Sequence, residues 1–167
     1  MATVKVTFDS QLGATWTHAF RQAITRLNTL FNHGTVGVTL SLTGSGPVIT
    51  VATDASIAVT IVHGKSHTET DLSGRLLKSE VRVPVRIVIS TPRAVRPAGP
   101  GIYEVVAAHE LVHSLGHNSH NTHLMSQTFQ TVAGRSAAGD RLQVSSGMLP
   151  PIQLSDESMG VLKGRWP

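Results

Sequence analysis

The sequence of 167 residues predicts a mixed α/β fold, because strand-like and helix-like segments follow one another along the chain. Residues 4–8, VKVTF, alternate polar and apolar side chains as a half-buried strand does. The next segment, from about residue 11 to residue 34, carries apolar side chains every three or four positions, which is typical of a helix that packs on a core. Several β-rich runs and two further helical segments complete the pattern.

The first predicted helix has the clearest boundaries. Asp9 or Ser10 can cap a helix that begins near Gln11, and Gly34 is well placed as the glycine at its C-terminal end. Its apolar stripe is formed by Leu12, Trp16, Phe20, Ile24, Leu27 and Phe31. The aromatic members of this stripe are expected in the core.

Apolar and β-branched residues dominate the middle of the chain, where a polar stretch at 64–73 interrupts a series of predicted strands. The segment 91–101, TPRAVRPAGPG, is rich in Pro and Gly and is expected to be a loop that leads to a helix over about 102–115. The predicted strands cover residues 36–42, 48–52, 57–63, about 74–80 and 85–90.

The last forty residues predict a loop followed by a helix. Residues 126–153 contain Gly, Ser and a Pro-Pro pair with weak periodicity, so a loop with short ordered pieces is expected. In LSDESMGVLKGRW, Ser155 can cap a final helix, and Asp156 and Glu157 suit the positive end of its dipole.

Composition limits the classes of function. With 40% hydrophobic residues the chain can bury one core, so residues 1–167 are expected to form a single domain. The net charge of +4 comes from scattered Lys and Arg residues, which argues against a nucleic-acid partner. No stretch of the sequence predicts a transmembrane segment or a signal peptide, and there is no cysteine for disulfide or thiol chemistry. A soluble protein is expected, while the sequence leaves its compartment and its oligomeric state open.

The run HELVHSLGHNSH contains a His-Glu-x-x-His motif, which predicts a metal site. His109 and His113 are four residues apart, so a helix places both imidazoles on one face, with Glu110 beside them. The motif arises by chance in only about one or two chains per hundred of this composition. Five of the nine histidines lie between residues 109 and 123. A catalytic Zn²⁺ site is therefore the favoured interpretation, ahead of a structural zinc site, which usually closes four protein ligands and often uses thiolates.

Residues 103–116, YEVVAAHELVHSLG, resemble the active-site helix of the metzincin zinc peptidases, the matrixin branch in particular. HLM at 123–125 resembles their Met-turn, with Met125 as an apolar floor beneath the imidazoles. The first strand with its long helix, and the C-terminal PIQLSDESMGVLKGRW, also resemble matrixin segments. The resemblance implies a twisted, mostly parallel five-stranded sheet backed by two helices. It also implies an N-terminal subdomain of about 1–116, a small C-terminal subdomain of about 117–167, and RLLKSEV as the antiparallel edge strand that pairs with an extended peptide.

The third metal ligand departs from the family pattern. Metzincins place it three residues after the helix glycine, and here that position is Ser119, a poor zinc ligand. A one-residue insertion makes His120 the ligand, and this is the favoured assignment. A two-residue deletion makes His117 the ligand instead, and His123 is a further alternative. If the helix continues past Gly116, His117 lies about 12 Å along the axis from His109, too far to share one ion.

The function so predicted is that of a zinc-dependent endopeptidase. A zinc-bound water would attack the peptide bond of an extended polypeptide, with Glu110 first as general base and then as general acid. The residues that bind the substrate remain unidentified. The shifted third histidine favours an alternative, an inactive or weakly active metzincin-fold component of a larger assembly. Hydrolysis of another amide, such as a cell-wall peptide bridge, is a third possibility.

Overall fold

The computed structural model describes residues 1–145, 147–149 and 152–167. The Pro-Pro pair of the segment 126–153, for which a loop was expected, lies outside the described residues. The helices are α1 (Ala14–Gly34), α2 (Pro100–Ser114) and α3 (Asp156–Arg165). The strands are β1 (Ala2–Phe8), β2 (Val38–Ser41), β3 (Val48–Thr53), β4 (Lys65–Thr70), β5 (Leu76–Val83), β6 (Val88–Ser90), β7 (Val95–Pro97), β8 (Gln130–Val132), β9 (Arg141–Val144) and β10 (Gly147–Met148).

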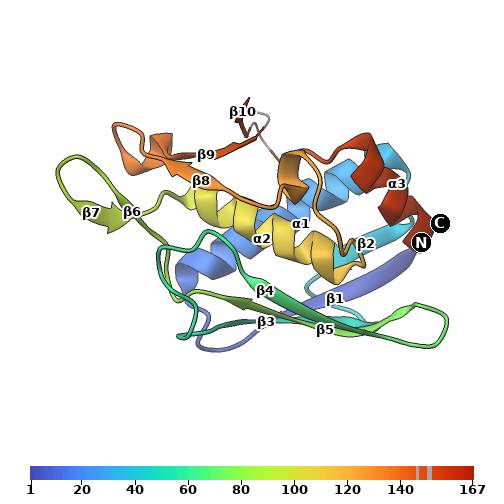
Figure 1. Cartoon of the computed structure of the whole chain (residues 1–167). Coiled ribbons are helices and arrows are strands. Elements are labelled where there is room, and N and C mark those ends of the chain that lie inside the picture. The colour runs from blue at the N-terminus through green and yellow to red at the C-terminus, as the bar shows by residue number, and fades with distance from the viewer. Residues whose placement is uncertain (146, 150–151) are drawn as a thin grey trace.

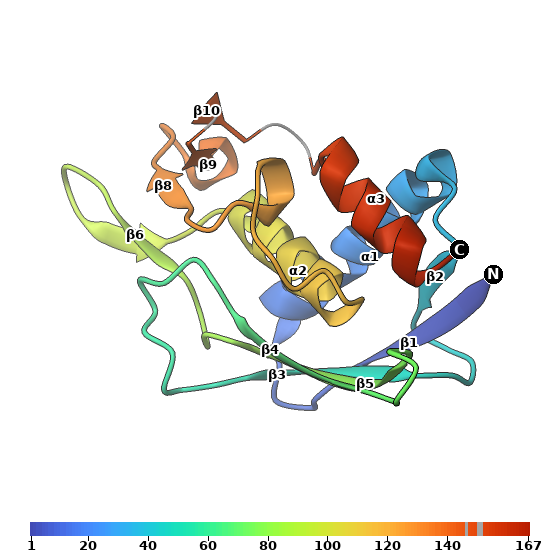
Figure 2. The same ribbon diagram turned by 45° about the vertical axis from the view of Figure 1, so that its right-hand side comes forward.

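The molecule is built on one five-stranded mixed sheet with α1 and α2 on the same face (Figures 1 and 2). The strand order is β2-β1-β3-β5-β4, and all neighbours are parallel except β4, which runs antiparallel to β5. The prediction of a five-stranded mixed sheet with helices packed on it is confirmed. The prediction that RLLKSEV forms the edge strand is wrong, because β5 lies inside the sheet and β4 occupies the edge.

The sequence of β4 explains why it was missed. Its six residues, KSHTET, are almost all exposed, so the strand has no alternation of apolar and polar side chains to reveal it. It falls in the polar stretch 64–73, which was not expected to contain a strand. Charged and hydroxyl side chains are common on exposed edge strands, where they oppose unwanted pairing with other chains.

Two other predicted segments are also wrong. Residues 57–63 form turns instead of a strand: the amide of Ile57 donates to the carbonyl of Asp54, and that of Ile61 donates to Ala58. Ile57 and Val62 are nevertheless buried, so the apolar run reflects burial in a turn. The segment 91–101 is not wholly a loop, because β7 pairs with β6 as a hairpin and α2 begins at Pro100.

The helix α1 begins three residues later than predicted. The Oδ1 atom of Asp9 accepts a hydrogen bond of 2.9 Å from the amide of Gln11, which forms a side-chain turn before the helix, and Gly13 is the N-terminal cap residue. The helix ends at Gly34 as predicted. Both predicted cap roles are wrong: neither Asp9 nor Ser10 caps the helix, and the left-handed cap conformation is taken by Thr35, with φ of 55°, and not by Gly34.

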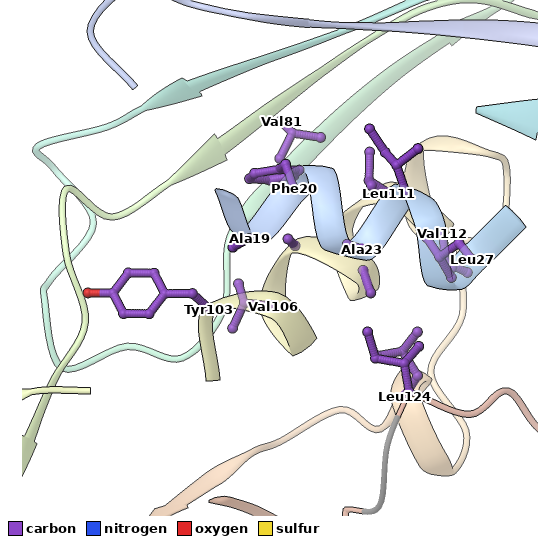
Figure 3. Close-up of a cluster of buried hydrophobic side chains, with 14 of the residues drawn as sticks. Ala19, Phe20, Ala23, Leu27, Val81, Tyr103, Val106, Leu111, Val112 and Leu124 are labelled. Carbon is purple, nitrogen blue, oxygen red and sulfur yellow. The ribbon is translucent and has the colours of Figure 1, made fainter. Parts of the chain in front are cut away.

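The core fills the space between the sheet and the helix pair. Figure 3 shows Phe20 of α1 next to Val81 of β5, and Leu27 of α1 near Val112 of α2. All four of these side chains are fully buried. One side of α2 packs against α1. This packing fixes which side chains of α2 face the C-terminal segment.

The C-terminal segment covers the opposite side of α2 from the sheet (Figure 2). It contains the three-stranded antiparallel sheet β10-β9-β8, where a loop with short ordered pieces was expected, and it ends in α3. The prediction of a final helix capped by Ser155 is confirmed, since its Oγ accepts a hydrogen bond of 3.1 Å from the amide of Ser158. Trp166 docks this end on the core through a bond of 2.9 Å from Nε1 to the carbonyl of Leu115.

Gly37 joins the two ends of the chain. Its carbonyl accepts a hydrogen bond of 2.8 Å from the amide of Ala2, and its own amide donates one of 2.7 Å to the carbonyl of Trp166. A Cβ atom at this position would lie 2.3 Å from the carbonyl oxygen of Pro167, so only glycine allows this close approach.

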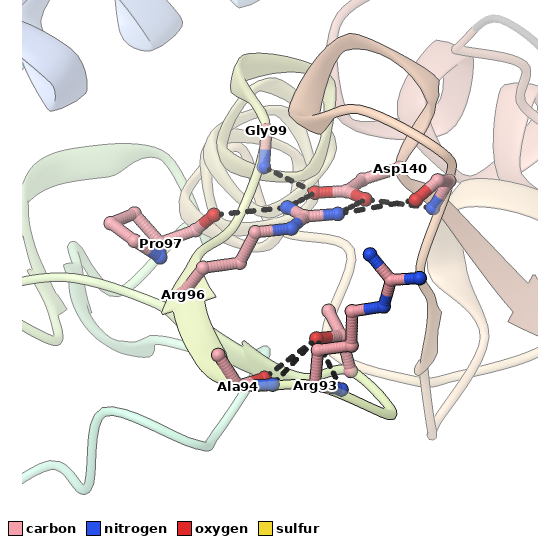
Figure 4. A network of polar contacts seen from close by, with 8 residues as sticks. Arg93, Ala94, Arg96, Pro97, Gly99 and Asp140 are labelled. Atoms are coloured by element: carbon pink, nitrogen blue, oxygen red, sulfur yellow. Dashed lines mark hydrogen bonds and ion pairs between the residues drawn. The ribbon is translucent and has the colours of Figure 1, made fainter.

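A partly buried ion pair ties the β6–β7 hairpin to the C-terminal segment (Figure 4). Both oxygens of Asp140 accept hydrogen bonds of 2.6 Å from the guanidinium of Arg96, and they also accept bonds of 2.9 Å from the amides of Gly99 and Gly134. Gly99 is the N-terminal cap residue of α2. The carboxylate therefore lies at the positive end of that helix, where the dipole stabilises a negative charge.

Within the described residues, no helix is both long and apolar enough to cross a lipid bilayer.

Candidate metal centre

Three of the predicted site residues, His109, Glu110 and His113, lie on the last turns of α2. His109 and Glu110 are buried, at 1% and 2% exposure, and His113 is partly exposed. The helix ends one residue later in a turn stabilised by two backbone bonds. The amide of Gly116 donates to the carbonyl of His113, and the amide of His117 donates to Val112. These bonds define a Schellman motif.

The Schellman motif brings the chain back over the helix. Gly116 takes φ of +102°, a left-handed conformation that side chains disfavour, so the helix ends there and does not continue toward His117. Four residues later the ring of His120 stacks on that of His109, with their centroids 5.4 Å apart. Figure 1 shows the returning segment beside the C-terminal half of α2. His120 thus joins the cluster of His109 and His113; that it is the third metal ligand stays a prediction.

The Nε2 atoms of the three histidines converge. The Nε2 atom of His113 lies 3.0 Å from that of His109 and 3.2 Å from that of His120. Two imidazole ligands of a tetrahedral zinc ion, each about 2.0–2.1 Å from the metal, have nitrogens roughly 3.4 Å apart. Ligand atoms of all three residues lie within 4.8 Å of one another, and this cluster could hold a metal ion.

Backbone carbonyls fix the tautomers of two of these rings. Nδ1 of His109 lies 2.7 Å from the carbonyl oxygen of Leu124, and Nδ1 of His113 lies 2.6 Å from that of His117. A carbonyl oxygen only accepts hydrogen bonds, so each Nδ1 carries the proton and each neutral ring has its lone pair on Nε2. Two lone pairs 3.0 Å apart repel each other unless a cation lies between them. The donor set therefore fits a metal ion.

Burial keeps the same rings uncharged. Loss of solvent lowers the pKa of His109 to about 3 and that of His113 to about 4. The neighbouring histidines lower both pKa values further. Neutral imidazole is the form that ligates metals. Three nitrogen ligands and no thiolate are typical of catalytic zinc sites, which leave a fourth position for water or substrate.

His117, the alternative third ligand, lies elsewhere. Its side chain is fully buried, and its Nε2 atom is 2.9 Å from Oγ of Ser158 in α3. Its backbone carbonyl is the acceptor that orients His113. Thus His117 supports the site through its main chain, while its ring docks α3. Ser119 is exposed, and Nδ1 of His123 contacts the hydroxyl of Thr122.

Met125 lies in a short 3₁₀ turn, His123–Met125, and its side chain is fully buried. The preceding carbonyl, that of Leu124, holds His109. The turn is therefore in direct contact with the histidine cluster through its backbone. That Met125 forms an apolar floor beneath the imidazoles stays a prediction.

Glu110 is held beside the cluster by the segment that precedes β4. Its Oε1 atom accepts a hydrogen bond of 3.0 Å from the amide of Gly64. Burial raises the pKa of Glu110 to about 7, against the opposing effect of this bond and of Ser66. A carboxyl group with a pKa near neutrality can both accept and release a proton, as a general acid–base residue must.

One further residue at the site was not found from the sequence. His63 is partly buried; its ring stacks on that of Phe129 with centroids 4.9 Å apart, and it meets His109 edge-on at 5.2 Å. A ring nitrogen of His63 belongs to a second group of possible ligand atoms, together with His109 and Glu110. A single histidine at the end of an apolar run gives no sequence signal of this role.

No protein-family model matches this chain, and a search of curated proteins finds no significant relative. The fold and the geometry alone therefore define the class of this protein. It is a mixed α/β protein with a three-histidine cluster that could bind a metal ion.

Proposed function

We propose that this protein is a zinc-dependent endopeptidase of metzincin type. The observation that carries the proposal is the convergence of three imidazole Nε2 atoms next to a buried carboxylate. His109, His113 and His120 would hold the ion, and Glu110 would be the proton carrier. Zinc in such a site acts as a Lewis acid and lowers the pKa of a coordinated water toward neutrality.

The protein's own residues supply the proton transfer. Glu110 is anchored at Oε1 by Gly64, so its other oxygen, Oε2, can take the proton of the attacking water and later release it to the departing amine. The carbonyls of Leu124 and His117, which accept hydrogen bonds from Nδ1 of His109 and His113, keep these rings in the tautomer that presents Nε2. Because these acceptors belong to the backbone, a substitution of their side chains leaves them in place.

The edge strand β4 supports an extended polypeptide as the substrate. It begins at Lys65, next to the Gly64 amide that holds Glu110, and its outer edge faces away from β5. An extended peptide can add to such an edge as a further strand, with backbone hydrogen bonds that do not depend on the peptide sequence. This arrangement favours a protease over an enzyme for small amides.

The test combines metal analysis with a peptide-cleavage assay in the presence and absence of a chelator. We expect one zinc per chain and cleavage that the chelator abolishes. Glu110→Gln should keep the zinc and lower kcat by about 10²–10⁴-fold, because it removes the proton carrier and spares the ligands. Glu104→Gln on the same helix is the matched control and should cleave normally.

Two results would contradict the proposal. Undiminished turnover in Glu110→Gln would exclude Glu110 as the proton carrier. Stoichiometric zinc without cleavage of any member of a peptide library would instead favour the alternative, a metzincin-fold component that retains the metal for structure.

A further inference from the structure

His63 places an unused polar atom at the site. Its Nε2 atom is buried and has no hydrogen-bond partner among the described residues. A buried polar group without a partner costs about 1–3 kcal/mol. The ring is nevertheless held firmly, by its stack on Phe129 and its edge-on contact with His109. Such an atom is positioned for a partner that the protein itself does not provide.

The distance to Glu110 defines the size of that partner. A ring nitrogen of His63 lies within 4.8 Å of a carboxylate oxygen of Glu110 and of a ring nitrogen of His109. One oxygen atom fits in a gap of this width if it accepts a hydrogen bond of about 2.8 Å from His63 and a second one from Glu110 once that carboxyl group carries the proton. His63 is grouped with His109 and Glu110, and not with His113 and His120, so it lies to the Glu110 side of the three-histidine cluster.

We propose that His63 is a further catalytic residue, whose Nε2–H donates a hydrogen bond to the substrate oxygen on which negative charge develops beside Glu110. The inference rests on the proposed function. When the water oxygen bonds to the carbonyl carbon, the water proton passes to Glu110 and the electron pair of the C=O double bond moves to the carbonyl oxygen. A donor already fixed at that oxygen stabilises this charge more than it stabilises the neutral substrate. His63 therefore acts on kcat more than on KM.

Three substitutions separate the hydrogen bond from the packing. His63→Phe keeps an aromatic ring against Phe129 and removes the donor. His63→Gln loses the ring and keeps an N–H donor, and His63→Ala loses both. His18→Phe, at an exposed position of α1, is the matched control for the change of residue type. Each variant is purified with zinc, and its metal content and melting temperature are measured before its kinetics.

We expect His63→Phe to retain zinc and the melting temperature of the wild type, with kcat lowered about 100-fold and KM changed less than about twofold. His63→Gln should recover about tenfold over His63→Phe. A second readout does not depend on turnover: a phosphinic peptide, which resembles the tetrahedral adduct, should bind His63→Phe about 10–100-fold more weakly than wild type. The affinity for the corresponding unreactive amide peptide should be unchanged.

Other outcomes overturn the inference. A kcat of His63→Phe within about threefold of wild type would show that the ring only packs. Loss of zinc in His63→Phe and His63→Ala would identify His63 as a metal ligand. If the wild type shows neither chelator-sensitive cleavage nor binding of the phosphinic peptide, the proposed function itself fails. That result differs from an active wild type whose His63→Phe variant is equally active.

Discussion

The amide of Gly64 donates a hydrogen bond of 3.0 Å to Oε1 of Glu110, across 46 positions in the sequence. This bond links the segment before the edge strand to the helix that carries the histidines. A Cβ atom at residue 64 would lie 2.6 Å from the carbonyl oxygen of Arg82 and 3.0 Å from Cγ of Glu110. The position therefore requires glycine if both neighbours are to keep their places.

We predict that Gly64→Ala lowers kcat about tenfold or more without loss of zinc. The added methyl displaces the 64–65 backbone and shifts the Glu110 carboxylate, and small displacements of a catalytic group have large effects on rate. Steady-state kinetics with metal analysis tests this. Gly101→Ala is the control, since a Cβ atom there meets nothing within 4 Å. Equal activity of the two variants would show that the contact is not needed.

Measurements of zinc affinity distinguish between His120 and His117 as the third ligand. His120→Ala should weaken zinc binding by at least 100-fold, because it removes one of three nitrogen ligands. His117→Ala should keep zinc and lower stability, because it removes a buried ring that contacts Ser158 and spares the carbonyl that orients His113. Competition with a zinc-binding dye measures the first effect, and thermal melting measures the second. Retention of tight binding by both variants would disprove the ligand assignment.

Asp140 should make the stability depend on pH in the acidic range. The hydrogen bonds from Arg96, supported by those from Gly134 and Gly99, hold the pKa of Asp140 below its ordinary value of 3.8. A carboxylate with a depressed pKa in the folded state contributes stability above the unfolded pKa and loses it as the pH falls through the folded pKa. We expect Asp140→Asn to melt several degrees below wild type at pH 7, with the difference shrinking below about pH 4.

Melting curves at pH 7, 5 and 3 test this prediction. The control is Glu69→Gln, which removes an exposed partner of Lys78 and should have almost no effect at any of these pH values. A melting difference for Asp140→Asn that stays constant from pH 7 to pH 3 would show that ionisation of Asp140 does not contribute.

Removal of a side chain from between α1 and α2 should destabilise the protein. Leu27 is fully buried between the two helices (Figure 3). Leu27→Ala should lower the free energy of unfolding by about 2–5 kcal/mol, from lost burial and the cavity it leaves. Leu72→Ala, at a fully exposed turn, should change it by less than about 0.5 kcal/mol. Urea denaturation of both variants provides the comparison.

The sequence predicted the regular elements best where burial is periodic. The alternating strand β1, the apolar stripe of α1, the motif helix α2 and the capped helix α3 were all expected near their observed positions. Local signals decide these cases: β1 and α1 bury one face in the core, α2 carries the histidine spacing, and α3 begins at a side-chain cap, Ser155. The His-Glu-x-x-His spacing belongs to the same kind of signal, since it depends only on the geometry of one helix.

The errors share a different origin. The edge strand β4 is stabilised by its hydrogen bonds to β5 and not by buried side chains, so its sequence shows no strand pattern. Residues 57–63 are apolar because Ile57 and Val62 are buried in turns. His63 becomes part of the site only through contacts with Phe129 and His109, which are far away in the sequence. Such long-range relationships cannot be read from local pattern.

The bridge at Gly37 has a consequence for how the molecule opens. Ala2 of the first strand bonds to the carbonyl of Gly37, and Trp166 after the last helix bonds to its amide. Each of these two segments is therefore linked to the other through Gly37. Release of the final residues would leave Gly37 free to move and would loosen the start of β1 as well. The amide protons of Ala2 and Gly37 should therefore exchange with solvent in one cooperative event and not independently of each other.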